Sequence, residues 1–223
     1  LPVEILNRFN QISPAPIIES YGLSEASPVV TLNPIHGPTK AGSIGIPIQE
    51  VEVAIMDTEG SPLPDGEVGE LWVRGKNVMK GYWQRPQATR STLQDGWLRT
   101  GDMGHRDADG FLFVTDRQKD MLLVNGINVY PREIEEHLYQ CEGVKEASVI
   151  GTTDARKGER PVAFVVMEEG YAAESLALTT YLKPRLAAYK IPRQFHFVDQ
   201  LPRTATGKVK KTLLREQLAS VSE

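Results

Sequence analysis

The first half of the chain has one stretch with helical spacing and several with the alternation typical of strands. Apolar residues recur every three or four positions over residues 3–12, which predicts an amphipathic helix. Residues 13–50 are rich in Pro, Gly, Ser and Thr, so mostly loop with short strands is expected there. Apolar and polar positions alternate over 50–57 and 67–74, which predicts two strands. The other elements expected in this half are a short helix over 86–93 and a strand over 111–114 that follows a turn at 107–110.

Helical and strand patterns alternate in the second half. The helix predicted over 131–139 has Pro131 in its first turn and glutamates near the positive end of its dipole. Pro184 is expected to kink or end a helix predicted over 174–187. The other expected elements are strands over 121–124, 144–151, 161–167 and 195–198 and a final helix over 211–218. The pattern predicts a mixed α/β (α+β) fold.

A dense run of charge, residues 116–120, separates the two halves. A solvated linker is the default interpretation of such a run, and a linker that swings has the same composition, because exposed charged residues lose little when they move. We therefore predict a domain boundary at 116–119. A β-rich part would occupy residues 1–116, and an α+β part residues 117–223.

Composition excludes several classes of protein. The 223 residues suffice for one large or two small domains, and the net charge of -4 excludes a nucleic-acid protein whose whole surface is basic. The single cysteine, Cys141, forms no intrachain disulfide and favours a reducing compartment. No apolar run reaches the roughly 18 residues of a membrane span. The start lacks a signal-peptide pattern and an initiator methionine, so we expect a fragment of a longer protein.

Two short motifs have the residue types of a nucleotide site. In residues 21–25 an aromatic ring can stack on a base, a hydroxyl can bond a phosphate and a carboxylate can bind Mg²⁺, although a strand ending in a polar turn explains the same residues. In Thr100-Gly101-Asp102 a carboxylate beside a glycine can accept bonds from ribose hydroxyls. An Asp that caps its own turn is the simpler interpretation of that motif.

The loop at 203–208 ends in Gly207-Lys208 and resembles a phosphate-binding loop in composition. It is not a P-loop, because the first glycine of that motif is absent and Val209 stands where Ser or Thr is required. Lys208 can still reach a phosphate or carboxylate as a mobile charge. The default interpretation of any single lysine is a solvated surface residue. The tail is locally basic, which suits nucleic acid, a triphosphate or coenzyme A, but few aromatic residues accompany these charges. The basic residues are Arg203, Lys208, Lys210, Lys211 and Arg215.

Metal and nucleophile motifs are otherwise missing from the sequence. The four histidines are far apart and none pairs with another at metal-ligand spacing, so no zinc site is assigned. No Gly-x-Ser-x-Gly motif and no cysteine-based dyad is evident.

The order of the longer motifs is more informative than any one of them. YGLSEASPVV, then DGWLRTGDMGHRDADGFLFVTDRQKDMLLVNGINVYPREIE, then YKIPRQFHFVDQLPRTATGK, resembles the adenylate-forming superfamily over nearly the whole chain. That superfamily contains acyl-CoA synthetases, adenylation domains of peptide synthetases and firefly luciferase. KDMLLVNGINVYPREIE in particular resembles bacterial medium- and long-chain fatty acyl-CoA ligases. The resemblance implies the end of a large adenylating domain followed by a small mobile domain.

The resemblance also implies a nucleotide site in the first part. Tyr21 would stack against adenine, Ser24 would bond the α-phosphate and Glu25 would bind Mg²⁺. Asp102 would hold the ribose hydroxyls, and Arg117 would contact the same ribose. Many family members have Thr in place of Ser24, and the hydroxyl is retained.

The second part would supply the moving groups. Lys119 would be the hinge about which the small domain rotates, and Gly126 would line the passage for the pantetheine arm of coenzyme A. Lys208 would reach the reacting carboxylate and the α-phosphate during adenylation only. Rotation would then remove Lys208 and present a different face to coenzyme A.

The implied activity is an ATP-dependent acyl-CoA ligase in the cytoplasm, which uses ATP, Mg²⁺ and coenzyme A to activate a carboxylic acid, expected to be a fatty acid. The family's Ser/Thr/Gly-rich loop that grips the β- and γ-phosphates is absent from the sequence, so the fragment alone is expected to be inactive. The alternatives are a ligase that loads a carrier protein and a non-catalytic nucleotide-binding module. These motifs specify neither the length of the acyl chain of the substrate nor the oligomeric state of the protein.

Overall fold

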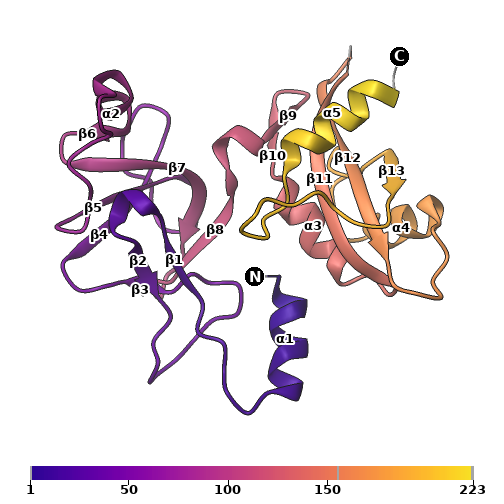
Figure 1. Ribbon diagram of the computed structural model, residues 1–223, viewed down its shortest axis with the longest axis horizontal. Coiled ribbons are helices and arrows are strands. Elements are labelled where there is room, and N and C mark those ends of the chain that lie inside the picture. Colours follow the sequence, from indigo (N-terminus) through magenta and orange to yellow (C-terminus); the bar gives the residue numbers. More distant parts are fainter. Residues whose placement is uncertain (1, 155, 222–223) are drawn as a thin grey trace. The chain divides into compact units, whose positions relative to one another are not determined.

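A computed structural model describes residues 2–154 and 156–221 of the chain. The contacts divide the chain into two units, residues 1–119 and residues 120–223, both drawn in Figure 1. The mixed α/β fold expected from the sequence is confirmed. Within the described residues, no helix is both long and apolar enough to cross a membrane.

The first unit is mostly β, as the alternating pattern predicts. Its small antiparallel sheet has the order β1-β2-β3, and its larger sheet has the order β4-β5-β7-β6 with β8 paired to β7 (Figure 1). The elements are α1 (Val3–Ile12), β1 (Ser20–Gly22), the 3₁₀ turn η1 (Ser24–Ala26), β2 (Val29–Leu32), β3 (Ile46–Pro47), β4 (Val51–Met56), β5 (Gly69–Gly75), α2 (Pro86–Thr92), β6 (Leu93–Gln94), β7 (Trp97–Arg106) and β8 (Leu112–Arg117).

The two sheets of the first unit share one apolar core. Along β4, Val53 and Ile55 are buried and Glu52 is exposed, so the predicted alternation is confirmed. Val30 of the small sheet packs in the same cluster as these residues. The other buried residues of this core are Ala26, Leu71, Val73, Leu98 and Leu112. The core therefore fixes how the end of β1 lies against β7 and β8.

The second unit alternates helices and strands. Its sheet has the order β10-β9-β12-β11, and β13 pairs with β12 in parallel. The elements are the turn η2 (Gln118–Asp120), which spans the division between the units, then β9 (Leu122–Val124), β10 (Ile127–Val129), α3 (Pro131–Tyr139), β11 (Val144–Asp154), β12 (Gly158–Met167), α4 (Ser175–Leu182), β13 (Gln194–Phe197) and α5 (Lys211–Val221).

Helices cover both faces of this sheet. Ala163 and Val165 of β12 pack with Ile134 of α3 and Leu178 of α4. The alternate positions of the strand, such as Phe164, pack with Leu214 of α5 on the other face. The unbroken burial of residues 147–150 in β11 and 161–166 in β12 follows from this arrangement, because the middle of each strand has packed layers on both sides.

The structure corrects one interpretation made from the sequence and confirms another. The interpretation of Asp102 as the cap of its own turn is wrong, because Thr100-Gly101-Asp102 lies inside β7. The expectation that Pro184 kinks or ends the helix predicted over 174–187 is confirmed, since α4 ends at Leu182, two residues before Pro184. Lys183 still has helical angles, φ -50 and ψ -46, but Pro184 has no N–H group to continue the helical hydrogen bonds, which accounts for the end of the helix.

Candidate active site

Tyr21 and Glu25 are brought together by a tight reversal of the chain after β1. A Cβ at Gly22 would lie 1.9 Å from the Pro28 carbonyl oxygen, so only glycine fits there. The Leu23 amide donates to that same oxygen at 2.8 Å, and η1 starts at Ser24. Tyr21 therefore sits on a strand, half-buried, while Ser24 is exposed on the following turn.

The Thr100-Gly101-Asp102 motif is a bulge in the ladder between β5 and β7. Glu70 pairs with Met103 and Trp72 with Arg99, so three residues of β7 face one residue of β5. Gly101 has φ 70, a left-handed conformation that glycine adopts without strain. The Thr100 hydroxyl donates to the Leu71 carbonyl at 2.8 Å and accepts from the Asp102 amide at 3.1 Å. Bulges redirect side chains, and this one turns Asp102 out of the ladder's regular alternation.

Asp102 is a buried carboxylate held by two other strands. The Tyr21 hydroxyl donates to its Oδ2 at 2.6 Å, and the Arg117 Nε lies 3.1 Å from its Oδ1. Burial first, and then the Asp102 charge, raises the pKa of the Tyr21 hydroxyl far above its usual value, so this hydroxyl stays a donor. The structure thus joins three predicted site residues that are up to 96 positions apart (21 to 117).

Glu25 lies on a pocket of about 420 Å³ in the same unit. The Tyr82 hydroxyl donates to Glu25 Oε1 at 2.8 Å, and the pocket is also lined by Thr100 and Gly101. Its volume is within the range of small-molecule sites, roughly 300–1,000 Å³. The pocket therefore connects the predicted carboxylate Glu25 with the bulge that carries Asp102.

In the second unit, Lys208 ends a braced loop. The loop is closed by hydrogen bonds between Thr204 and Lys208, the Thr204 amide donating to the Lys208 carbonyl at 2.8 Å. The Arg203 guanidinium donates to the Gly207 carbonyl at 2.6 Å and binds Glu146 at 2.7 Å. Lys208 itself is exposed, and within the described residues its ammonium group has no partner.

Gly126 is at the tip of the hairpin between β9 and β10. Asn125 and Gly126 have φ 53 and 77, the pair of positive angles of a type I′ turn, which Asn-Gly favours. No atom lies within 4 Å of a Cβ added at Gly126. Lys119 is exposed in η2, and the two units divide directly after it.

The basic tail is less available than its composition suggests. Arg203, Lys211 and Arg215 each bind a carboxylate of the same unit, at 2.7 Å for Glu146, 2.9 Å for Glu135 and 2.9 Å for Asp120. Within the described residues, Lys208 and Lys210 are the exposed cations of the tail that form no such pair. A continuous basic surface for nucleic acid is therefore not formed by these residues.

Sequence reasoning missed two residues that line the pocket. Tyr82, which binds Glu25, was not singled out, and neither was Glu70, whose buried carboxylate accepts bonds from the bulge. A signal for Glu70 was present, because one carboxylate among the apolar residues of β5 is unusual. No local pattern links Tyr82 to Glu25, since 57 residues separate them.

Comparison with known proteins identifies the family of the chain. The family model described as AMP-binding enzyme matches residues 1–83, and the one described as AMP-binding enzyme C-terminal domain matches residues 133–208. The chain belongs to the AMP-binding enzyme family. The first match contains Tyr21, Ser24 and Glu25, and the second ends at Lys208.

Relatives and solved structures of this family are similar over nearly the whole chain. A long-chain-fatty-acid–CoA ligase of Bacillus subtilis is 44% identical over 97% of the chain, and a feruloyl-CoA synthase of Amycolatopsis is 41% identical over 97%. ATP-bound MatB from Rhodopseudomonas palustris matches with a TM-score of 0.94 at 34% identity, over 99% of the chain and 44% of MatB. The chain spans 39% of the Bacillus ligase and 44% of the Amycolatopsis synthase.

Proposed function

We propose that the protein is an ATP-dependent, AMP-forming acyl-CoA ligase, of which this chain carries the nucleoside-binding strands and the mobile C-terminal domain. The observation that supports this most is the buried Asp102 carboxylate, presented by a bulge between Tyr21 and Arg117. Names of the relatives, a long-chain-fatty-acid–CoA ligase and a feruloyl-CoA synthase, point to the same reaction class. The proposed acid is a fatty acid.

Residues of the first unit would bind AMP and its precursors in both half-reactions. Asp102 would accept bonds from the ribose hydroxyls, with Arg117 beside the same sugar and the Tyr21 ring against adenine. The short Tyr21–Asp102 bond supports a common site for base and sugar. Ser24 is exposed at the start of η1, where its hydroxyl can reach a phosphate.

Glu25 would hold Mg²⁺ through its carboxylate. No group of three or more His, Cys, Asp or Glu side chains suited to a metal occurs in the part of the chain that the structure describes. Mg²⁺ keeps several waters and takes one or two carboxylates together with substrate phosphates, so a single protein carboxylate is enough for the proposed role. When bound, the ion would add positive charge at the phosphates, while Tyr82 orients the Glu25 carboxylate.

Lys208 would act during adenylation, when the substrate carboxylate attacks the α-phosphorus and pyrophosphate leaves. Negative charge accumulates on the oxygens around the α-phosphorus, and a cation placed beside them stabilises the transition state more than the ground state. Coenzyme A then attacks the acyl carbon, AMP leaves, and no such charge needs Lys208. We propose that a rotation at Lys119 withdraws Lys208 and brings Gly126 beside the pantetheine arm. The division of the chain directly after Lys119 supports a hinge there.

The cytoplasm is the proposed location, because ATP and coenzyme A are available there and the one cysteine, Cys141, is a free thiol. Oligomeric state has no bearing on this proposal.

Assay of the complete protein tests the proposal. It would be given ATP, Mg²⁺ and a panel of fatty acids plus ferulate, with and without coenzyme A, and products would be identified by mass spectrometry. We expect acyl-AMP and pyrophosphate without coenzyme A, and acyl-CoA and AMP with it. Acyl transfer only to a carrier protein would favour a carrier-loading ligase. Nucleotide binding without any adenylate would indicate a binding module and contradict the proposal.

A further inference from the structure

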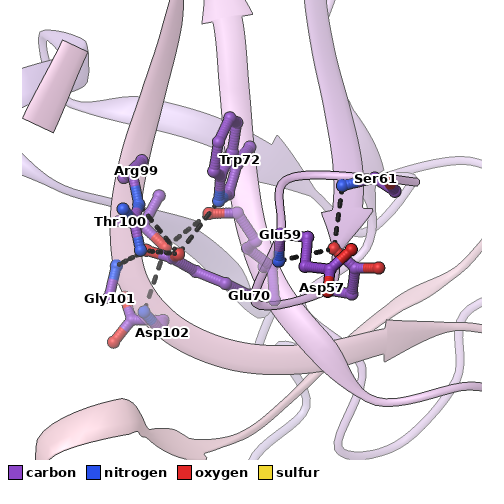
Figure 2. A network of polar contacts seen from close by, with 10 residues as sticks. Asp57, Glu59, Ser61, Glu70, Trp72, Arg99, Thr100, Gly101 and Asp102 are labelled. Atoms are coloured by element: carbon purple, nitrogen blue, oxygen red, sulfur yellow. Dashed lines mark hydrogen bonds and ion pairs between the residues drawn. The ribbon is translucent and has the colours of Figure 1, made fainter. Parts of the chain in front are cut away.

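The carboxylate of Glu70 lies under the Thr100-Gly101-Asp102 bulge, where sequence motifs did not place a functional residue. Its side chain is 6% exposed, and it accepts hydrogen bonds from three residues (Figure 2). Oε1 accepts from the Gly101 amide at 3.0 Å. Oε2 accepts from the Trp72 indole at 3.0 Å and from the Arg99 guanidinium at 3.1 and 2.9 Å.

The two oxygens of Glu70 have different tasks. The bonds on Oε2 neutralise the buried charge, because Arg99 is its ion-pair partner and lies over the Trp72 ring, 5.3 Å from its centroid. A buried carboxylate without such partners would be costly. The bond on Oε1 satisfies an amide that the bulge has removed from the strand ladder. Without Glu70, the Gly101 N–H would lose its protein acceptor at the point where the chain turns.

The bulge is thus held from both sides. Thr100 ties it to the Leu71 carbonyl and to the Asp102 amide, while Glu70 ties the intervening glycine. Because Gly101 at φ 70 can adopt many conformations, these bonds are what select the one that directs Asp102 toward Tyr21 and Arg117.

We infer that Glu70 is a positioning residue of the nucleoside site: its carboxylate fixes the bulge so that Asp102 is preorganised to accept the ribose hydroxyls. The inference rests on the proposed function and extends it to a residue that does not touch the ribose itself. Glu70 acts through Asp102, so its effect on nucleotide binding depends on Asp102 being present.

A double-mutant cycle on the complete protein tests this dependence. AMP affinity would be measured by calorimetry for wild type, Glu70→Gln, Asp102→Asn and the double variant, and Tm for each. In Glu70→Gln, one carboxylate oxygen is replaced by an NH₂ group, which is a donor. In either orientation of the amide this NH₂ faces another donor, either the Gly101 N–H or the N–H groups of Arg99 and Trp72, so at least one hydrogen bond is lost. We expect Glu70→Gln to weaken AMP binding about tenfold, the factor that one charge-assisted hydrogen bond supplies, and to add little in the Asp102→Asn background.

Glu52→Gln is the matched control. Glu52 forms a similar bidentate pair with Arg74 between β4 and β5, at 3.1 and 2.6 Å, but it is exposed and not bonded to the bulge. Its AMP affinity should equal that of wild type. Thr100→Val removes the other brace of the bulge and supplies a second variant with the same expected phenotype if Glu70→Gln does not fold.

The outcomes separate the two proposals. Wild-type affinity in both Glu70→Gln and Thr100→Val, or equal losses from Glu70→Gln with and without Asp102, would overturn the positioning role alone. Failure of the wild-type protein to bind AMP would overturn the proposed function and the inference that rests on it.

Discussion

The two units hold their candidate residues in opposite ways. In the first, Asp102 is buried and bound by Tyr21 and Arg117, on a bulge that is itself braced. In the second, Lys208 is exposed with no partner for its ammonium group in the described residues, and Gly126 sits at an open hairpin tip. A group that binds the nucleoside throughout a reaction profits from a fixed position, which lowers the entropy cost of binding.

The exposure of Lys208 and Gly126 in the second unit suits groups that have to move. A group needed in one half-reaction only has to approach and leave, and strong partners in its own domain would oppose that movement. What the second unit does fix is the backbone beneath these residues, through the Arg203–Gly207 bond and the Asn-Gly turn. The comparison predicts that substitutions in the first unit change affinity for nucleotide, whereas those in the second change single steps.

Lys208→Ala should give the largest effect of the set. Acyl-AMP formation by the complete protein should fall roughly 10²–10³-fold, the range found when one group that stabilises transition-state charge is removed. Thioester formation from preformed acyl-AMP should be nearly unchanged. Rapid-quench assays of each half-reaction would measure both. Lys210→Ala, an exposed cation two residues along the same loop, is the control; equal losses in both half-reactions would break the comparison.

Asp102→Asn should follow in size. It keeps the shape of the side chain but leaves one oxygen where two ribose hydroxyls need acceptors. Because a hydrogen bond to a charged group contributes about 1.5–3 kcal/mol, AMP and acyl-AMP should bind roughly 10- to 150-fold more weakly. Calorimetry on the complete protein would show it.

A control for Asp102→Asn lies in the turn that joins β7 to β8. Asp107 accepts bonds from the Asp109 and Phe111 amides and pairs with Lys40, without lining the pocket. Asp107→Asn should lower Tm and leave AMP affinity alone. A similar loss of affinity in both variants would mean that Asp102 acts only through stability.

Much of the fold was predictable because hydrophobic periodicity is local. The helix over 3–12, the alternation along β4 and the helix from Pro131 to Tyr139 all follow from spacing within a dozen residues. β7 was missed because its bulge places Thr-Gly-Asp in mid-strand, a sequence that is typical of turns. That bulge is created by pairing with β5, which no local pattern reports.

The candidate site divides along the same line. Tyr21, Asp102 and Arg117 were identified as site residues from motifs and from the family resemblance. That their side chains contact one another could not be predicted, because it depends on three strands packing on one core. Glu70 and Tyr82 are connected to the site only by contacts across the fold, so chemistry in the sequence did not reveal them. The structure shows that Tyr21, Asp102 and Arg117 meet, but their roles stay predictions. The same holds for Ser24, Glu25, Lys119, Gly126 and Lys208.

Gly126→Ala should have the smallest effect and can sharpen the comparison inside the second unit. Gly126, Gly207 and Gly170 have φ of 77, 82 and 87, and none has an atom within 4 Å of an added Cβ. Alanine at each should therefore cost a similar backbone strain, roughly 1–2 kcal/mol, without a clash. Three equal losses of stability, measured by denaturant unfolding of the complete protein, would leave position as the only difference between the variants. We expect Gly126→Ala to slow thioester formation, Gly207→Ala to slow acyl-AMP formation by displacing Lys208, and Gly170→Ala to slow neither. If Gly126→Ala and Gly170→Ala have the same kinetics, the hairpin tip has no part in the coenzyme A step.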